Sequence, residues 1–576
     1  MKQLKYIFNI YIILLLISCA KQSTPMGGPK DEDPPKLLSI NPTNESLNVK
    51  PRTIELEFDE YIKAENPNKQ IIITPRIKKE EMEVTAIKNK VFIKLNQDLE
   101  DSTTYVFNFQ KTIKDITENN VPENLKLVFS TGPTIDSLSF SGKVSYIFPR
   151  QEKLMKDVLV GLYAIGDTTD ILSAPPYYIG QADSMGIFKI TNIKAGDFLA
   201  YAWHDSNNSL KAEEKLESYG FLGDTISIND NISDAQFYLS KADLSEFKIN
   251  RATTVGSNFD VVLSKFPVDI EIKHEALNEK IFYRKNEKII RFYHTEIKND
   301  STAVQLSLTD SVGFKIDTLI YTKFEESERT KEKLEPIIEG PKNFVRQLSL
   351  DVKFNKPLQI INYDSLMLKY DSASIIQIKK EHTFFKDSLN RTLLTISLQV
   401  SDTISNETFN FFAADSTFTD IEGIYNENKL EAAYKRLKPE SLAEEVKVKV
   451  NTSELPIILQ ILNKKDEIIR EKYLTETNET VFKDVEPGIF YIRAIIDRNK
   501  NKRWDTSNML ENRQAEPVYY LENPNDNNSR DTTIRAGWVL EVTIEPNKPL
   551  GIPTKPIENE PKEKIIDNIN VDNSIK

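Results

Sequence analysis

Apolar and polar residues alternate with a period of two along much of this chain, which is the pattern of half-buried β-strands. In the segment 54–58 (IELEF) the three apolar side chains fall on one face of the predicted strand. Similar runs follow at residues 91–95, 105–109 and 125–129, with turn-forming residues between them. Short strands at this spacing predict a β-sandwich over residues 36–132.

The strand pattern is repeated within the chain. Residues 348–354 (LSLDVKF) match the strand at 54–58, and residues 482–494 (FKDVEPGIFYIRA) repeat the strand–turn–strand pattern of 188–202. Two kinds of β-domain therefore each occur twice, in the same order. Between the two copies, residues 245–334 predict a further small β-domain whose type the sequence does not assign.

The N-terminus has the plan of a secretory signal peptide, with Lys2 and Lys5 before an apolar run at residues 6–17. The segment 16–19 (LISC) resembles a bacterial lipobox, which implies cleavage before Cys19 and lipidation of its sulfur, palmitate included. Cys19 is the only cysteine, so it has no disulfide partner within the chain. An ordinary signal peptide with an incidental cysteine is the alternative. We expect a mature lipoprotein that begins at Cys19.

Three short stretches carry a family resemblance: residues 41–43 (NPT), 54–61 (IELEFDEY) and 129–132 (FSTG). They are similar to the bacterial Ig-like domain of the S-layer-protein type. Together with the lipobox and the tether sequence GGPKD at 27–31, they resemble a family of Bacteroidota lipoproteins named for that domain. Residues 136–240 resemble transthyretin-like (carboxypeptidase-regulatory-like) β-sandwich modules. The resemblance implies an envelope location and an architecture, and it does not imply an activity.

The predicted fold is all-β, with several tandem β-sandwich domains, Ig-like and transthyretin-like, after a lipoprotein signal peptide. The predicted segments are the signal peptide (1–18), a flexible tether (19–35), an Ig-like domain (36–132), a transthyretin-like sandwich (136–240), the unassigned β-domain (245–334), a second Ig-like domain (335–440), a second transthyretin-like sandwich (443–546) and a disordered tail (547–576). The tail is rich in Pro, Lys, Asn and Asp, and this composition favours disorder.

The net charge, the single cysteine and the absence of catalytic motifs argue against several classes of function. The net charge is -12, with 75 basic residues scattered among 87 acidic ones, and this disfavours nucleic acid as a partner. A single cysteine excludes disulfide staples and cysteine-based zinc sites. No motif of a serine hydrolase, zinc peptidase or phosphate-binding loop occurs. Asp59 and Glu60 are adjacent on a strand end, where side chains alternate between faces, so we expect a solvated loop edge there and not an acid/base pair.

One constellation has the spacing of a calcium loop. Asp497, Asn499, Asn501 and Asp505 place oxygen-bearing side chains at positions 1, 3, 5 and 9, and residues 205–213 have the same spacing with weaker ligands. The glycine and the bidentate glutamate of calcium loops are missing. These differences favour an Asx-rich loop that hydrogen-bonds its own backbone. The sequence therefore predicts no cofactor, with calcium at these four residues as the alternative hypothesis.

These observations predict a non-enzymatic, lipid-anchored scaffold or protein-interaction module of the cell envelope, acting as an accessory to outer-membrane protein assembly or transport. The alternative is a surface adhesin that binds glycan or matrix. Ala20 follows the lipidated cysteine where an aspartate would signal inner-membrane retention, so we expect the outer membrane. The predicted partners are that membrane and other envelope proteins such as outer-membrane β-barrels. The sequence does not choose between the periplasmic and the cell-surface side, nor does it indicate an oligomeric state.

Overall fold

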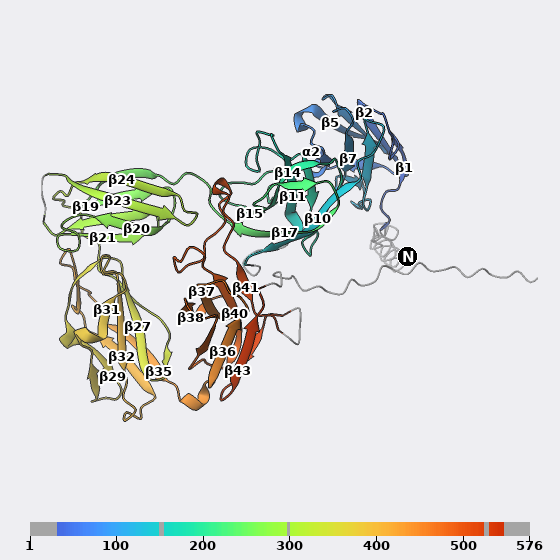
Figure 1. The fold of residues 1–576 in the computed structure, drawn as a ribbon. Helices are drawn as coiled ribbons and strands as arrows, with labels where there is room; N and C mark the ends of the chain where they lie inside the picture. Colours follow the sequence, from blue (N-terminus) through green and yellow to red (C-terminus); the bar gives the residue numbers. More distant parts are fainter. Residues whose placement is uncertain (1–30, 149–154, 297–299, 524–528, 547–576) are drawn as a thin grey trace, which may run out of the picture. The chain divides into compact units, whose positions relative to one another are not determined.

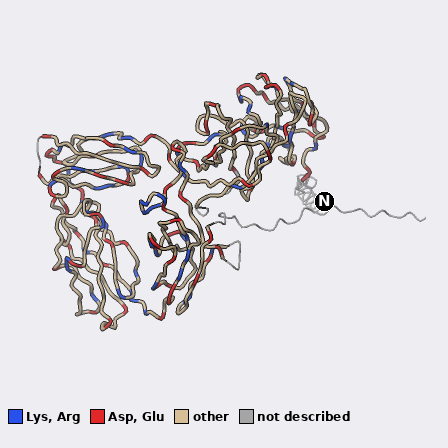
Figure 2. Tube along the Cα trace, viewed as in Figure 1, with Lys and Arg blue, Asp and Glu red and all other residues tan. Residues whose placement is uncertain are grey.

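The computed structural model describes residues 31–148, 155–296, 300–523 and 529–546. These residues form β-strands joined by turns and very short helices, which confirms the predicted all-β chain (Figure 1). Lys and Arg are interspersed with Asp and Glu along the described trace (Figure 2). Cys19 with its lipobox, and the tail from 547, lie outside the described residues. The chain divides into two compact units. The first comprises the residues up to 138 together with 177–179 and 191–194. The second comprises 139–176, 180–190 and the residues from 195 onward.

The first domain has two main sheets around one apolar core. The strand orders are β1-β2-β6-β5 and β4-β7-β9, and β3 pairs with β8. Its elements are β1 (Leu37–Asn41), β2 (Thr53–Phe58), β3 (Ile62–Ala64), the short helix α2 (Pro67–Gln70), β4 (Ile72–Thr74), β5 (Met82–Ile87), β6 (Lys90–Leu95), β7 (Thr104–Asn108), β8 (Ile113–Asp115) and β9 (Lys126–Ser130). In β2 the alternate residues Ile54, Leu56 and Phe58 are fully buried, as the period-two pattern predicts.

The domain between the repeats has the strand orders β18-β19-β22-β21 and β20-β23-β24. Its strands are β18 (Ile249–Val255), β19 (Asn258–Leu263), β20 (Pro267–Lys273), β21 (Ile281–Asn286), β22 (Ile289–His294), β23 (Thr302–Asp310) and β24 (Lys315–Thr322). Its core gathers side chains from both sheets, including Val261, Ile290 and Leu306, all fully buried.

The next domain has the orders β25-β27-β32-β31 and β26-β35-β33-β29-β30, and β28 pairs with β34. Its strands are β25 (Pro336–Glu339), β26 (Asn343–Phe344), β27 (Gln347–Phe354), β28 (Leu358–Ile361), β29 (Leu366–Lys369), β30 (Ile375–Gln377), β31 (Thr383–Phe385), β32 (Leu393–Gln399), β33 (Thr408–Ala413), β34 (Phe418–Asp420) and β35 (Leu430–Arg436). Strand β27 contains the repeated LSLDVKF sequence, and its residues alternate between exposed or half-buried and buried along its whole length.

These three domains share one sheet plan. The orders β18-β19-β22-β21 and β25-β27-β32-β31 repeat β1-β2-β6-β5. In the middle domain the single strand β20 takes the place of β3 and β4 of the first domain. In the same way, the single strand β23 takes the place of β7 and β8. The pairing register also agrees at one place, where the partners are Ile62 with Asp115, Pro267 with Asp310, and Leu358 with Asp420. The domain that the sequence leaves unassigned therefore has the strand plan of residues 36–132 and of residues 335–440.

The other two domains share a different plan, in which the first and last strands pair in parallel: β10 with β17 and β36 with β43. The first copy has the order β12-β11-β14-β15-β17-β10-β13, with β16 on β14; the second has β38-β37-β40-β41, with β42 on β40, and β39-β36-β43. The strands are β10 (Leu138–Tyr146), β11 (Val158–Ala164), β12 (Tyr178–Gln181), β13 (Ile187–Ile193), β14 (Gly196–His204), β15 (Ser218–Phe221), β16 (Ile226–Ile228), β17 (Ile232–Lys241), β36 (Glu445–Val450), β37 (Ile457–Leu462), β38 (Ile468–Leu474), β39 (Glu479–Phe482), β40 (Gly488–Ile496), β41 (Val518–Tyr520), β42 (Thr532–Ile534) and β43 (Val539–Ile544).

Candidate functional site

The predicted calcium loop follows the last residue of β40, and Asp497 at its start is fully buried. The carboxylate of Asp497 accepts the backbone N–H of Asn501 on Oδ1 at 3.1 Å and that of Lys502 on Oδ2 at 2.8 Å. Lys500 and Lys502 have φ angles of 63° and 65°, in the left-handed region. The loop therefore turns tightly around one buried carboxylate, whose two oxygens both accept backbone N–H groups.

The other predicted ligands lie in the same loop. The side-chain amides of Asn499 and Asn501 donate to Oδ2 of Asp505 at 2.7 and 2.5 Å. The Oδ1 atoms of the two asparagines accept backbone N–H groups within the loop. Because amide nitrogens, and not oxygens, face Asp505, the arrangement is that of an Asx-rich loop closed by its own hydrogen bonds.

Glu516, which lies downstream of this loop, accepts hydrogen bonds from it, and the sequence spacing did not predict this contact. Its side chain is 5% exposed, and it accepts the backbone N–H of Arg498 at 2.8 Å and that of Asp505 at 3.0 Å. Burial raises the pKa of Glu516, and the charge of Asp505 acts in the same direction, while the backbone hydrogen bonds oppose the rise. Nothing in a calcium-loop pattern points to a residue so far downstream.

The first copy of this domain builds the same loop. Asp205 accepts the backbone N–H groups of Ser209 and Leu210 at 2.8 and 2.9 Å. Glu217, 2% exposed, accepts the N–H of Ser206 at 2.7 Å, and burial raises its pKa as it does for Glu516. Leu210 has a φ of 62°, which matches Lys502. A comparison of the two repeats is therefore the sequence signal that could have found both glutamates.

The structure thus brings Asp497, Asn499, Asn501 and Asp505 together, but their oxygens serve the loop itself. Across the described ranges, no group of three or more His, Cys, Asp or Glu side chains is arranged to hold a metal ion. Calcium binding at these residues stays a prediction.

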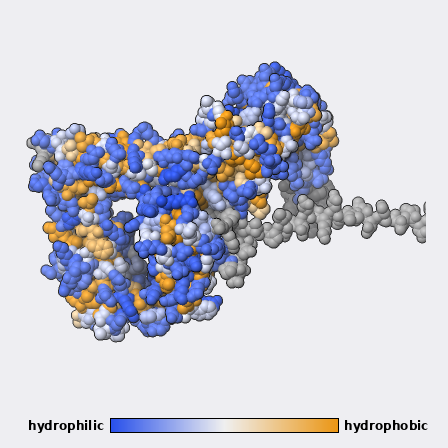
Figure 3. All heavy atoms as spheres, in the orientation of Figure 1, coloured by the Kyte–Doolittle hydropathy of each residue, from blue (hydrophilic) through white to orange (hydrophobic). Residues whose placement is uncertain are grey.

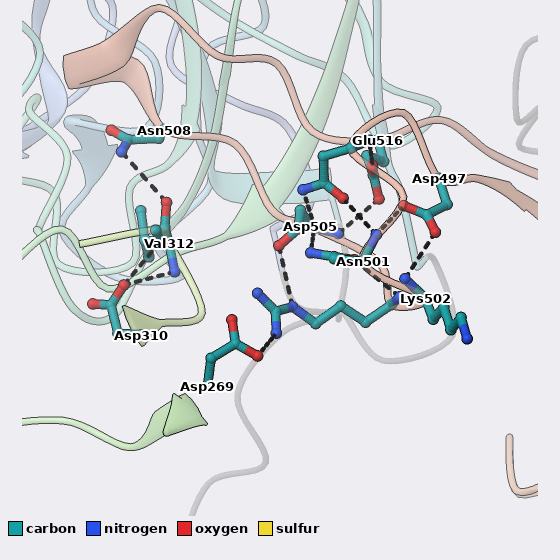
Figure 4. A network of polar contacts seen from close by, with 12 residues as sticks. Asp269, Asp310, Val312, Asp497, Asn501, Lys502, Asp505, Asn508 and Glu516 are labelled. Atoms are coloured by element: carbon teal, nitrogen blue, oxygen red, sulfur yellow. Dashed lines mark hydrogen bonds and ion pairs between the residues drawn. The ribbon is translucent and has the colours of Figure 1, made fainter. Parts of the chain in front are cut away.

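The second copy differs from the first in the segment that comes after the turn at Lys502. Residues 503–514, here called the junction loop, contact both the first copy and the middle β-domain. Figure 4 shows the contacts with the middle β-domain. The hydroxyl of Tyr219 donates to the Ser507 carbonyl oxygen at 2.9 Å, and the Thr506 hydroxyl bonds to Ser240 at 3.0 Å. All four of these residues are no more than 4% exposed. The junction loop is therefore a buried polar contact between segments more than 260 residues apart.

The junction loop also reaches the middle β-domain. The buried Asn508 donates from Nδ2 to the Val312 carbonyl oxygen at 3.4 Å, and Arg513 donates to the same oxygen. The guanidinium of Arg503 lies 2.6 Å from Oδ1 of Asp269. A carbonyl that receives both an amide and a guanidinium donor is well satisfied, so the contact is specific in geometry.

Trp203 in β14 and Trp504 in the junction loop both serve packing. Trp203 is fully buried, and Trp504 packs edge-on against Phe148 with ring centroids 4.7 Å apart. The indole N–H of Trp504 donates to the Glu516 carbonyl oxygen at 2.9 Å.

Among the described residues, no helix has the length and apolar content that crossing a bilayer demands.

Comparison with known proteins shows what the first domain is similar to. No curated protein matches the chain. Among solved structures, the Bacillus anthracis TIE protein is 10% identical over 93% of this chain and 78% of its own, with a TM-score of 0.12. Domains 1–6 of surface layer protein SbsC are 9% identical over 87% of this chain and 66% of theirs, with a TM-score of 0.13. TM-scores this low carry no argument about function. The family model of the bacterial Ig-like domain matches residues 31–131, so this part of the chain is similar to that family, as the sequence predicts.

Proposed function

We propose that this chain is a non-enzymatic, lipid-anchored scaffold of the cell envelope that holds binding surfaces at fixed spacing. The lipobox resemblance at Cys19 supports the anchor, and the match of residues 31–131 to bacterial Ig-like domains supports the envelope setting. Ala20 after Cys19 supports the outer membrane, and that location supports an accessory role beside other envelope proteins such as outer-membrane β-barrels.

The observation that carries the proposal is the junction loop. A chain of sandwiches joined only by linkers would let each domain move freely, because relative motion is the default for domains that share no interface. Here buried Ser507 and Asn508 bond to two other domains, and the salt bridge of Arg503 with Asp269 adds a third contact. Such contacts fix the spacing of edges and end loops, which is what a scaffold requires.

The surface is compatible with contacts of mixed polarity. On the face drawn in Figure 3, apolar spheres form small groups among hydrophilic ones. Exposed apolar side chains such as Leu38, Leu216 and Tyr321, each more than 60% exposed, come from different domains. Partner binding by strand edges and end loops suits a surface of this kind.

The proposal is tested by affinity purification of the tagged protein from detergent-solubilised envelope after mild cross-linking. We expect the wild type to recover a reproducible envelope protein. The variant Tyr219→Phe, which removes one junction hydrogen bond, should recover less of it, whereas Tyr321→Phe on an exposed strand should not change the yield. Recovery of no stable partner by the wild type would count against a scaffold.

A further inference from the structure

The three domains that share one sheet plan carry a charged residue at the same structural position. In each domain, the charged residue stands two positions before a strand residue that pairs with a buried aspartate. The pairs are Ile62 with Asp115, Pro267 with Asp310, and Leu358 with Asp420, and the charged residues are Glu60, Lys265 and Lys356. Each charged residue lies in the bend before its strand; Lys265 and Lys356 contact their aspartates from there, and Glu60 occupies the same bend in the first domain.

In the middle domain this position holds a buried ion pair. The ammonium of Lys265 contacts Oδ2 of Asp310, and the two side chains are 6% and 2% exposed. The other oxygen of Asp310 accepts the backbone N–H groups of Val312 and Gly313 in the turn that follows, at 3.0 and 2.9 Å. One carboxylate thus binds a turn with one oxygen and a cation with the other.

The second Ig-like domain repeats this arrangement. The side chains of Lys356 and Asp420 are both fully buried, with Nζ 2.5 Å from Oδ2 of Asp420 and 3.1 Å from Oε2 of Glu422. Oδ1 of Asp420 accepts the backbone N–H groups of Glu422 and Ile424, each at 2.9 Å. In both domains the chain supplies its own ammonium ion to the buried carboxylate.

The first Ig-like domain has the carboxylate but a second acid in place of the lysine. Asp115 is 1% exposed and accepts the backbone N–H groups of Glu118 and Asn120 at 2.6 and 2.9 Å. Glu60 replaces the lysine, and neither Glu60 nor Asp115 takes part in an ion pair between described residues. Burial raises the pKa of Glu60, and the charges of Asp115, Asp59 and Asp31 raise it further. Asp59 is exposed and Glu60 is partly exposed, and both lie in the bend between β2 and β3, which is the loop edge that the sequence predicts.

We infer that Glu60 and Asp115 of the first Ig-like domain bind a lysine side chain presented by a protein partner. The inference rests on the proposed function and names the chemistry of the partner. The other two domains show what the position accepts, since in each of them an ammonium group contacts the corresponding aspartate. Charge complementarity supports the same occupant, because Glu60 and Asp115 carry no countercharge from the described residues.

A lysine fits this position better than a divalent metal. Calcium takes six to eight oxygen ligands, and the described residues contain no group of three or more His, Cys, Asp or Glu side chains arranged for a metal. Both oxygens of Asp115 already accept backbone N–H groups, and an ammonium ion can share these oxygens at hydrogen-bond distance.

The test uses the full chain labelled with 15N-asparagine, because the amides of Asn119 and Asn120 donate to Asp115 and report on this position. The probe is the capped tripeptide acetyl-Gly-Lys-Gly-amide, and its glutamine analogue is the control. We expect saturable shifts of these two resonances with the lysine peptide only. Glu60→Lys, which supplies an internal ammonium as in the other domains, should weaken the response by about tenfold or more.

Two further variants keep the test decisive. Glu60→Gln removes the charge without adding a longer side chain, and we expect it to weaken the peptide response too. Glu80→Lys makes the same charge change and is the control. Glu80 precedes β5, whereas Lys88, whose carbonyl oxygen accepts the backbone N–H of Ile62, follows the other end of that strand. This variant should therefore respond to the peptide as the wild type does.

Equal shifts with both peptides, no shifts at all, or a response to calcium and not to the lysine peptide would each overturn the inference. If the envelope partner were still recovered with Glu60→Lys, the scaffold proposal would stand while this assignment of its binding position would fall.

Discussion

Replacing Lys356 by methionine tests how much the buried ion pair contributes to the stability of the domain at residues 335–440. The side chain is fully buried, with Nζ 2.5 Å from Asp420, and it also donates to the Glu332 carbonyl oxygen. Methionine keeps most of the apolar stem but removes the cation, so the buried Asp420 loses its countercharge. Breaking a buried pair from one side costs about 3–5 kcal/mol. We expect the free energy of unfolding of this domain to fall by that amount.

The assay is scanning calorimetry of the full chain combined with hydrogen exchange of β28 and β34, which assigns the affected transition to this domain. A loss of 1 kcal/mol lowers the midpoint of a domain of this size by about 4–8 °C, so we expect a drop of roughly 12 °C or more. Lys353→Met is the matched control, because Lys353 is 60% exposed and lies 3.5 Å from Glu339; its effect should stay within about 0.5 kcal/mol. Equal effects of the two substitutions would refute the reasoning.

Three further predictions concern the junction loop and its neighbour. Burial raises the pKa of Glu516, so the stability that this group contributes is fully present below its ordinary pKa of 4.5 and is lost as the pH rises through the raised value. Urea titrations should show the stability of the wild type relative to Glu516→Gln falling as the pH rises above 4.5. Tyr219→Phe leaves the buried Ser507 carbonyl without its hydroxyl donor, so hydrogen exchange at 507–509 should quicken and stability should fall by about 1–3 kcal/mol; unchanged exchange would contradict the junction. If Asp497 and its three partners bind calcium, titration calorimetry of the chelator-treated chain will show heat that Asp497→Asn abolishes; no heat and no melting shift would refute the site.

The strand pattern could be predicted because each sandwich has one buried and one solvated face along most strands. Ile54, Leu56 and Phe58 alternate with glutamates, and the same rule identifies residues 348–354. The plan of residues 245–334 could not be predicted, because its topology depends on which strands pair across long separations and local alternation does not record pairing. The structure supplies that pairing, and with it the sheet plan shared by three domains.

The residues of the two candidate loops were also predicted only in part. Spacing identified Asp497 and Asp205 as the first residues of two related loops, because alternate oxygen side chains favour tight turns. It did not find Glu516 or Glu217, since their roles depend on the chain returning to the loop. The proximity of Glu60 to Asp115 was also hidden, because it depends on the pairing of β3 with β8.

The lipid anchor at Cys19 is the claim on which the envelope assignment depends. Its most direct test is fractionation of cells grown with a labelled fatty acid, comparing the wild type with Cys19→Ser. The account predicts that the wild type carries label and sediments with the outer membrane, because multiple acyl chains on one residue are sufficient for stable anchoring. It predicts that Cys19→Ser is unlabelled and is either released from membranes or left unprocessed. A variant that matures and stays on the outer membrane would contradict the account.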